Sequence, residues 1–163
     1  MQRSSIRPRV EELNAFRFAD AVSTKQRVTV SCEIAAPIWR VYLNWKRLER
    51  FPSFVPAVKE ARWLERKRLY WREAHEGKQF ESTFAIKTNL RENSLSWQSL
   101  SGPESSGSAQ CEPLPDGGSR LTLWIEFVAD AESQSPGAVR SRHEAFVSAF
   151  KEFVENAPAQ ARI

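Results

Sequence analysis

Hydrophobic and polar residues alternate through most of the chain, and helical spacing dominates in only two stretches. The first alternating segment is QRVTVSCEI, residues 26–34, where one side carries Val28, Val30, Cys32 and Ile34. Alternation of this kind predicts a strand with one face buried. Ala35-Ala36-Pro37 ends this strand, and Pro37 suits the first turn of a helix.

Apolar residues then recur at spacings of four and three, at Val41, Trp45 and Leu48. This spacing predicts a helix. The pairs Phe51-Pro52 and Val55-Pro56 follow, and a residue before proline avoids the helical region. We therefore expect two short helices after the first strand.

Strand signals then follow in quick succession. The predicted strands are 58–64, 69–75, 78–90, 95–100, 108–114 and 120–128, with a loop at SGPESSG (101–107) and a turn at PDGG (115–118). Glu76-Gly77 can form a two-residue hairpin turn. That turn would pair His75 with Lys78, Glu73 with Phe80, Trp71 with Ser82, and Leu69 with Phe84. One face of the hairpin then carries Leu69, Trp71, Glu73, Phe80, Ser82, Phe84 and Ile86.

The second helical stretch is the longest in the chain. Its apolar stripe is Val139, His143, Phe146, Val147, Phe150, Phe153 and Val154, and Pro158 ends it. Antiparallel strands with helices segregated around them predict an α+β fold. We expect a curved antiparallel sheet of about six or seven strands around this helix, with a cavity between them. One domain spans residues 25–158, preceded by an extension (1–24) that could form a short helix and followed by a tail (159–163).

Composition and charge exclude several function classes. With two His, two Cys and no CxxC motif, the sequence supports neither a metal site nor a disulfide framework. The expected cofactor is none. Residues 1–72 carry a net charge of +9 and residues 73–163 of −5, but no nucleic-acid motif accompanies the basic half. The sequence has no apolar stretch of membrane-spanning or signal-peptide length, so we expect a cytoplasmic protein without membrane insertion.

Two stretches resemble a known superfamily. VTVSCEIAAPIWRVYLNWKRLERFPSFVPAVKEARWL and LSWQSLSGPESSGSAQCEPLPDGGSRLTLWIEF are similar to the helix-grip (SRPBCC) superfamily, which includes START domains, polyketide cyclase/dehydrases and coenzyme-Q-binding proteins. The resemblance covers roughly residues 26–157 and is strongest to the bacterial cyclase/dehydrase-like branch. Tyr42 and Phe51 stand where that branch usually has tryptophan.

The resemblance implies a helix-grip fold whose cavity holds small apolar ligands. Members that resemble true aromatase/cyclases carry an inward-facing arginine on the strand after the glycine-turned hairpin. Counted from Gly77, that position is Ile86 here. Isoleucine cannot stabilise an enolate or carboxylate, which counts against cyclase activity.

The candidate catalytic residues are Glu73 and His143. A buried Glu73 could have a raised pKa and act as a general acid or base, and His143 could shuttle protons. The simpler alternatives are that Glu73 is solvent-exposed at the end of its strand and that His143 only contributes to the packing of the helix. His75 is expected to be an exposed turn residue. The candidate ligand-binding residues are Trp71, Phe80, Ser82, Phe84, Ile86, Trp97, Leu123, Ile125, Phe146 and Phe150. The alternative for the aromatic members is a filled core.

Three functions therefore remain open. The first is binding or transport of a small hydrophobic ligand, such as a lipid, a quinone or a polyketide-like compound. The second is a cyclase or dehydratase with a cavity acid/base, and the third is a protein-interaction module. A cavity of several hundred Å³ would favour ligand binding, whereas a filled core with an exposed apolar patch would favour the protein-interaction module. A homodimer is left open.

Overall fold

The computed structural model describes residues 25–130 and 134–156. The elements follow the order β1 (Lys25–Ile34), α2 (Ile38–Trp45), the 3-10 helix η1 (Leu48–Ser53), β2 (Val58–Leu64), β3 (Arg68–His75), β4 (Lys78–Asn89), β5 (Ser94–Ser101), β6 (Ser105–Pro113), β7 (Ser119–Val128) and α3 (Pro136–Asn156). The predicted extension at 1–24 and tail at 159–163 lie outside the described residues.

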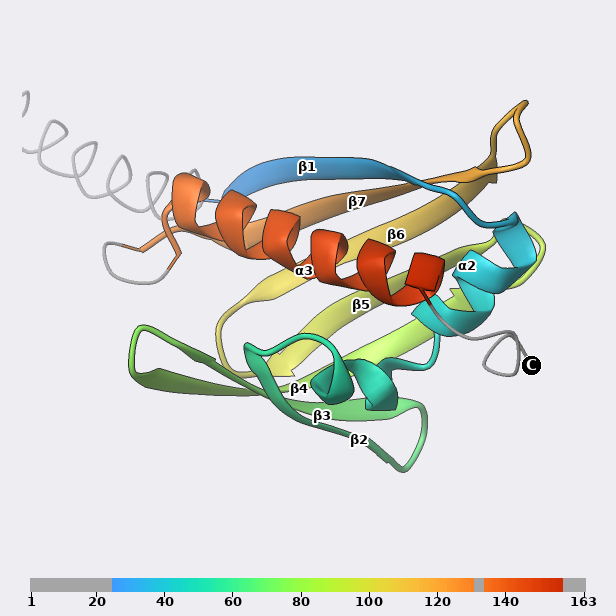
Figure 1. Cartoon of the computed structure of the whole chain (residues 1–163). Coiled ribbons are helices and arrows are strands. Elements are labelled where there is room, and N and C mark those ends of the chain that lie inside the picture. Colours follow the sequence, from blue (N-terminus) through green and yellow to red (C-terminus); the bar gives the residue numbers. More distant parts are fainter. Residues whose placement is uncertain (1–24, 131–133, 157–163) are drawn as a thin grey trace, which may run out of the picture.

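The strands form one antiparallel sheet in the order β1-β7-β6-β5-β4-β3-β2. The sheet curves around α3, which lies across it (Figure 1). The short helices α2 and η1 pack against the C-terminal half of α3. The α3 stripe buries Val139, Val147, Phe150 and Val154 against the sheet. This arrangement confirms the predicted α+β helix-grip fold.

The β3–β4 hairpin has the register that the sequence predicts. His75 pairs with Lys78, Glu73 with Phe80, Trp71 with Ser82, and Leu69 with Phe84. Glu76 and Gly77 form the turn, with φ angles of 51° and 81°. Positive φ at both central residues is the geometry of a two-residue hairpin turn that follows the twist of the strands.

Strand β6 begins earlier than the sequence predicts. Ser105, Ser106 and Gly107 were expected in a loop because serine and glycine are typical of loops, yet all three pair with β7. Gly107 also pairs with Trp97 of β5. A Cβ atom on Gly107 would lie 2.6 Å from Cζ2 of Trp97, so the missing side chain lets the indole lie against the sheet.

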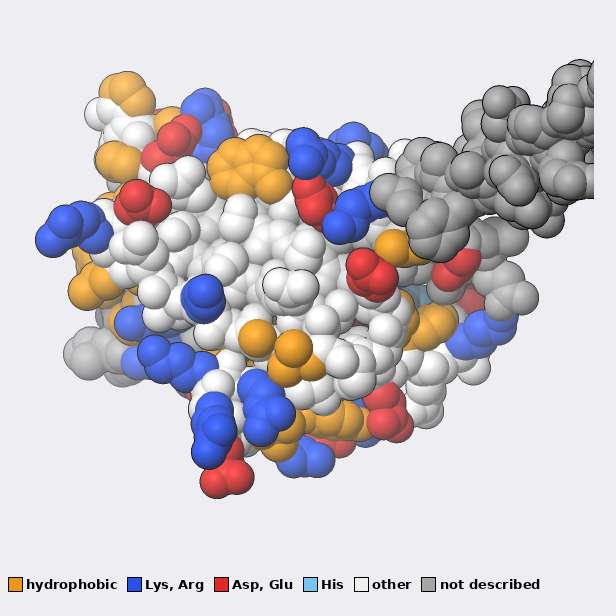
Figure 2. Space-filling view, turned by 180° about the vertical axis from the view of Figure 1, so that it is seen from behind, with side chains coloured by type: hydrophobic (Ala, Val, Ile, Leu, Met, Phe, Trp, Pro, Cys, Tyr) orange, Lys and Arg blue, Asp and Glu red, His pale blue; other side chains and the backbone are white. Residues whose placement is uncertain are grey.

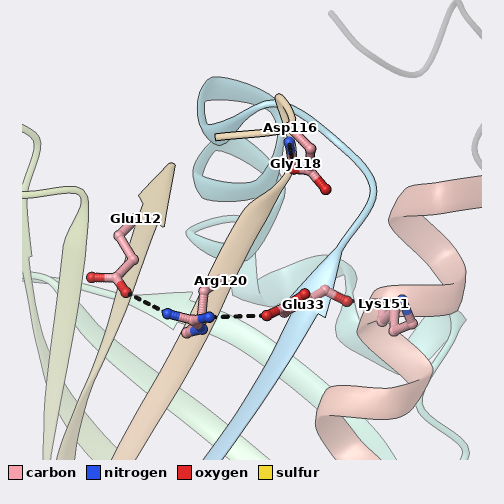
Figure 3. Close-up of polar contacts among 6 residues, drawn as sticks. All are labelled: Glu33, Glu112, Asp116, Gly118, Arg120 and Lys151. Carbon is pink, nitrogen blue, oxygen red and sulfur yellow. Dashed lines mark hydrogen bonds and ion pairs between the residues drawn. The ribbon is translucent and has the colours of Figure 1, made fainter. Parts of the chain in front are cut away.

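A row of ion pairs crosses the outer side of β1, β7 and β6. Arg120 lies between Glu33 and Glu112, with guanidinium–carboxylate distances of 2.9 Å and 3.2 Å (Figure 3). On the other side of β1, Nζ of Lys151 donates to the backbone oxygen of Glu33 at 2.8 Å and joins α3 to the sheet. Such exposed pairs contribute little stability.

Candidate functional site

A cavity of about 120 Å³ lies between the sheet and α3. It is smaller than the several hundred Å³ that would by itself favour ligand binding over the other two functions. Ten of its lining residues are apolar and three are polar, and every described strand except β1 and β2 contributes. The lining residues are Trp45, Leu48, Leu69, Trp71, Glu73, Phe84, Ile86, Leu95, Trp97, Ser105, Leu123, His143 and Phe146.

The cavity is small because an aromatic cluster fills the remainder of the space under α3. Phe51 of η1 lies 5.1 Å from Phe146 and 5.8 Å from Phe150, measured between ring centroids. Trp45 meets Phe150 edge-on at 4.9 Å, and Trp71 lies 5.8 Å from Phe146. Contacts of this kind stabilise beyond simple burial. The two expectations for the aromatic residues, cavity wall and filled core, thus both describe part of the interior.

The structure brings most of the predicted site residues to the cavity. Both candidate catalytic residues, Glu73 and His143, line it. So do six of the candidate ligand-binding residues, namely Trp71, Phe84, Ile86, Trp97, Leu123 and Phe146.

Four predicted residues lie elsewhere. Phe80 lines a separate hollow of about 40 Å³ at the sheet end. Ser82 is buried close to Gly102 of the β5–β6 loop. Ile125 is buried without reaching the cavity, and Phe150 belongs to the aromatic cluster. Alternation assigns a side chain to a face, but it does not tell which part of that face is covered by a neighbour.

Five lining residues were absent from the predicted site. They are Trp45, Leu48, Leu69, Leu95 and Ser105. The spacing of Trp45 and Leu48 marked an apolar helical face, and Leu69 stood on the predicted hairpin face. No signal in the sequence pointed to Ser105, because it lies in the segment expected to be a loop.

Glu73 is held as a carboxylate by its neighbours on β3. Its Oε2 accepts a hydrogen bond from Nε1 of Trp71 at 2.8 Å, and its Oε1 lies 2.6 Å from Nε2 of His75. Burial opposes ionisation of Glu73, but the hydrogen bonds from His75 and Trp71, together with the attraction to either histidine when it is protonated, outweigh it and hold the pKa of Glu73 below the ordinary value. Of the two possibilities for Glu73, the one with a raised pKa is therefore wrong.

His75 is also not the exposed turn residue that the sequence suggested. Its side chain is 20% exposed and is bonded to Glu73. Trp71, Glu73 and His75 follow each other at every second position of β3, so they share one face of the strand. That spacing was visible in the sequence and would have located the cluster.

His143 occupies the helix wall of the cavity as a neutral imidazole. Its Nδ1 lies 2.8 Å from the backbone oxygen of Val139. A carbonyl oxygen only accepts, so Nδ1 carries the proton and Nε2 keeps its lone pair. Burial lowers the pKa of His143, although the Val139 bond and the charge of Glu73 oppose that shift. Among the described residues, no hydrogen bond reaches Nε2 and none joins His143 to Glu73.

Two other polar groups belong to the cavity wall. The hydroxyl of Ser105 accepts a long hydrogen bond of 3.4 Å from Nε1 of Trp97 and can donate its own hydrogen. Nε1 of Trp45 is buried and has no hydrogen-bond partner among the described residues. Among the residues that the structure describes, no Lys or Arg lines the cavity, and Ile86 is one of its lining residues.

The two cysteines are protonated thiols in the structure. Burial raises the pKa of Cys32 to about 11 and that of Cys111 to about 12. Both are free. Within residues 25–130 and 134–156, no group of three or more His, Cys, Asp or Glu is placed to hold a metal ion. None of the described helices is both long and apolar enough to cross a membrane.

The fold and its lined interior define a helix-grip protein, and the comparisons agree. The sequence profile of the family described as polyketide cyclase/dehydrase and lipid transport matches residues 34–146. The chain belongs to this family. A relative from Streptomyces lincolnensis, an uncharacterised 17.2 kDa protein of the melC2–rnhH intergenic region, is 22% identical over 134 residues, which is 79% of this chain and 89% of that protein.

Two solved structures illustrate the shared fold. The Zhui aromatase/cyclase from Streptomyces sp. R1128 superposes with a TM-score of 0.69 at 16% identity, over 85% of this chain and 99% of that one. A START superfamily protein from Mycobacterium smegmatis gives a TM-score of 0.70 at 17% identity, over 81% and 99% of the two chains. At these identities the likeness concerns the fold alone.

Proposed function

We propose that this protein binds a small hydrophobic molecule in the cavity between the sheet and α3, and that His143 accepts a hydrogen bond from a hydroxyl group of that molecule. The observation that carries this proposal is the lone pair of Nε2, which belongs to a neutral imidazole in an otherwise mostly apolar wall. Nε2 is not among the fully buried atoms without a partner, so a ligand hydroxyl can donate to it, and a hydrogen bond within a mostly apolar wall is stronger than one in water.

The size and charge of the cavity limit the ligand further. An apolar cavity of about 150 Å³ holds one benzene ring, so a volume of about 120 Å³ favours a ligand body of about one ring. The described part of the wall offers no Lys or Arg to an anionic ligand, and the Glu73 carboxylate would repel one. We therefore infer a neutral ligand.

Binding of two matched probes tests this proposal. 4-Fluorophenol should bind about five- to tenfold more tightly than fluorobenzene, because one hydrogen bond contributes about 1 kcal/mol. His143→Phe should remove that difference while still binding fluorobenzene. Fluorine NMR titration measures both affinities. If neither probe binds the wild-type chain, the cavity is not a ligand site; if both bind equally, His143 is not the acceptor.

A second candidate function is acid/base catalysis of the cyclase or dehydratase type. Glu73 and His143 line the same cavity, and a neutral imidazole can remove a proton from carbon next to a carbonyl. The absence of an arginine at Ile86 weighs against stabilisation of the enolate that would result.

Hydrogen–deuterium exchange on a one-ring ketone tests this second candidate. In deuterated buffer, the chain should accelerate exchange of the α-hydrogens of cyclohexanone, followed by proton NMR. His143→Gln should lower the protein-dependent rate by about 100-fold or more, and Glu73→Gln should lower it as well, with binding of fluorobenzene to the glutamine variants serving as the control. Equal exchange in the wild type and both variants would exclude catalysis by this pair.

A further inference from the structure

We propose that the β2–β3 edge of the molecule docks on an anionic lipid bilayer, with the hairpin turn between these strands as its leading point. The basic edge is defined as residues 46–72, from the end of α2 through η1 and β2 to β3. It carries nine Lys and Arg against three Glu, a net charge of +6, whereas the whole chain carries only +4. The positive charge of the protein is thus concentrated on one edge.

The tip of this edge combines cations with exposed apolar side chains. Trp63 is 41% exposed and Leu64 is 37% exposed, directly before the turn. Arg66, Lys67 and Arg68 are all exposed, and none forms an ion pair with a described residue. In Figure 2, seen from behind, blue side chains gather with orange ones along the lower border, where β2 and β3 lie.

The backbone of the turn gives an independent argument. Arg66 and Lys67 both have positive φ angles, 61° and 59°. Asn-Gly or Gly-Gly is preferred in such a turn, because in this region a Cβ atom comes too close to the backbone carbonyl oxygen, and arginine and lysine cannot offset this as asparagine does with a local hydrogen bond. Two basic residues therefore stand where other residues would be more stable. Residues that maintain such strain often serve a function.

The apolar groups favour a bilayer over a nucleic acid. Tryptophan prefers the headgroup region of a membrane, and basic residues add about 1 kcal/mol each near an anionic surface. Nε1 of Trp63 donates to Glu49 of η1 at 2.9 Å, which orients the indole. A nucleic-acid surface would offer the phosphates but no apolar layer for Leu64. Such docking is peripheral and inserts no helix.

The docking edge is also close to the cavity. Leu69, which lines the cavity, is the register partner of Trp63 on β2. Leu48 of η1 lines it too. Contact with the bilayer at this edge would hold the cavity next to the lipid, in which hydrophobic molecules dissolve. The docking does not depend on the proposed ligand, because the exposed side chains at the tip, Trp63 to Arg68, do not line the cavity.

Vesicle co-sedimentation of the full chain tests the proposal. The chain should bind phosphatidylcholine vesicles that contain phosphatidylglycerol and should not bind vesicles of phosphatidylcholine alone, and added salt should weaken binding. Arg66→Asn/Lys67→Gly should lower the partition coefficient about tenfold or more. The same variant should unfold at a higher temperature, since its turn residues suit positive φ. Trp63→Ser/Leu64→Ser should also weaken binding.

The matched control removes two charges from the opposite end of the sheet. Lys25→Gln/Lys78→Gln changes the net charge by the same amount but leaves the basic edge intact, so it should keep most of the binding. An equal loss in this control would show that only total charge matters and would overturn the proposal. Binding to a short DNA duplex that depends on Arg66 and Lys67, without binding to anionic vesicles, would assign the edge to nucleic acid instead.

Discussion

Gly107→Ala should destabilise the protein by about 2–3 kcal/mol, which lowers the melting temperature of a domain this size by roughly 4–12 °C. The added Cβ would lie 2.2 Å from the backbone oxygen of Trp124 and 2.6 Å from Cζ2 of Trp97. The backbone contact cannot relax without disturbing the β6–β7 pairing. The indole contact can relax only by moving Trp97 toward the cavity, so affinity for 4-fluorophenol should fall as well.

Gly137→Ala is the matched control for this substitution. A Cβ on Gly137, in the first turn of α3, would meet nothing within 4 Å. Alanine in a helix is more favourable than glycine by up to about 1 kcal/mol, so this variant should be unchanged or more stable. Urea unfolding of both variants gives the comparison. A Gly107→Ala variant as stable as the wild type would show that Trp97 does not depend on the missing side chain.

Phe146→Ala should open the cavity at a cost of about 3 kcal/mol. The Phe146 ring lies between the cavity and the aromatic cluster, with Phe51 at 5.1 Å, Trp71 at 5.8 Å and Trp45 at 5.9 Å. Its removal joins new space to a cavity that now suits about one ring. The variant should therefore bind 4-fluoro-1-naphthol, a two-ring probe, about tenfold more tightly than the wild type does, by fluorine NMR.

Phe153→Ala controls for the loss of a partly buried ring elsewhere on α3. Phe153 stacks on Phe54 at 4.1 Å and does not line the cavity. This variant should lose stability without a change in naphthol affinity. If the wild type already binds 4-fluoro-1-naphthol as tightly as Phe146→Ala, the Phe146 ring does not limit the size of the ligand.

Elements with a strong local pattern were predictable from the sequence. The β3–β4 register follows from Glu76-Gly77, because a two-residue turn fixes every pair that comes after it. The α3 stripe follows from apolar residues at spacings of three and four. Both signals are local, so no knowledge of the tertiary structure was needed.

Features that depend on distant neighbours were not predictable in the same way. Ser105 and Gly107 belong to a strand because β5 and β7 pair with them on either side, although their composition is typical of a loop. Phe150 faces the interior as expected, but Phe51 of η1 stacks on it and keeps it from the cavity. The pKa of Glu73 depends on His75, whose side chain was expected to be exposed.

The order of the strands has a consequence for folding during synthesis. Every neighbouring pair in the sheet is consecutive in sequence except β1 and β7. Lys25 pairs with Val128 and Ile34 with Ser119, so β1 has its complete partner only when β7 has been made as far as Val128, about 5–20 s after Ile34 at ordinary elongation rates. During that interval Val28, Val30 and Ile34 have no sheet to cover them. The nascent chain should expose this apolar strand to chaperones longer than any other part of the sheet.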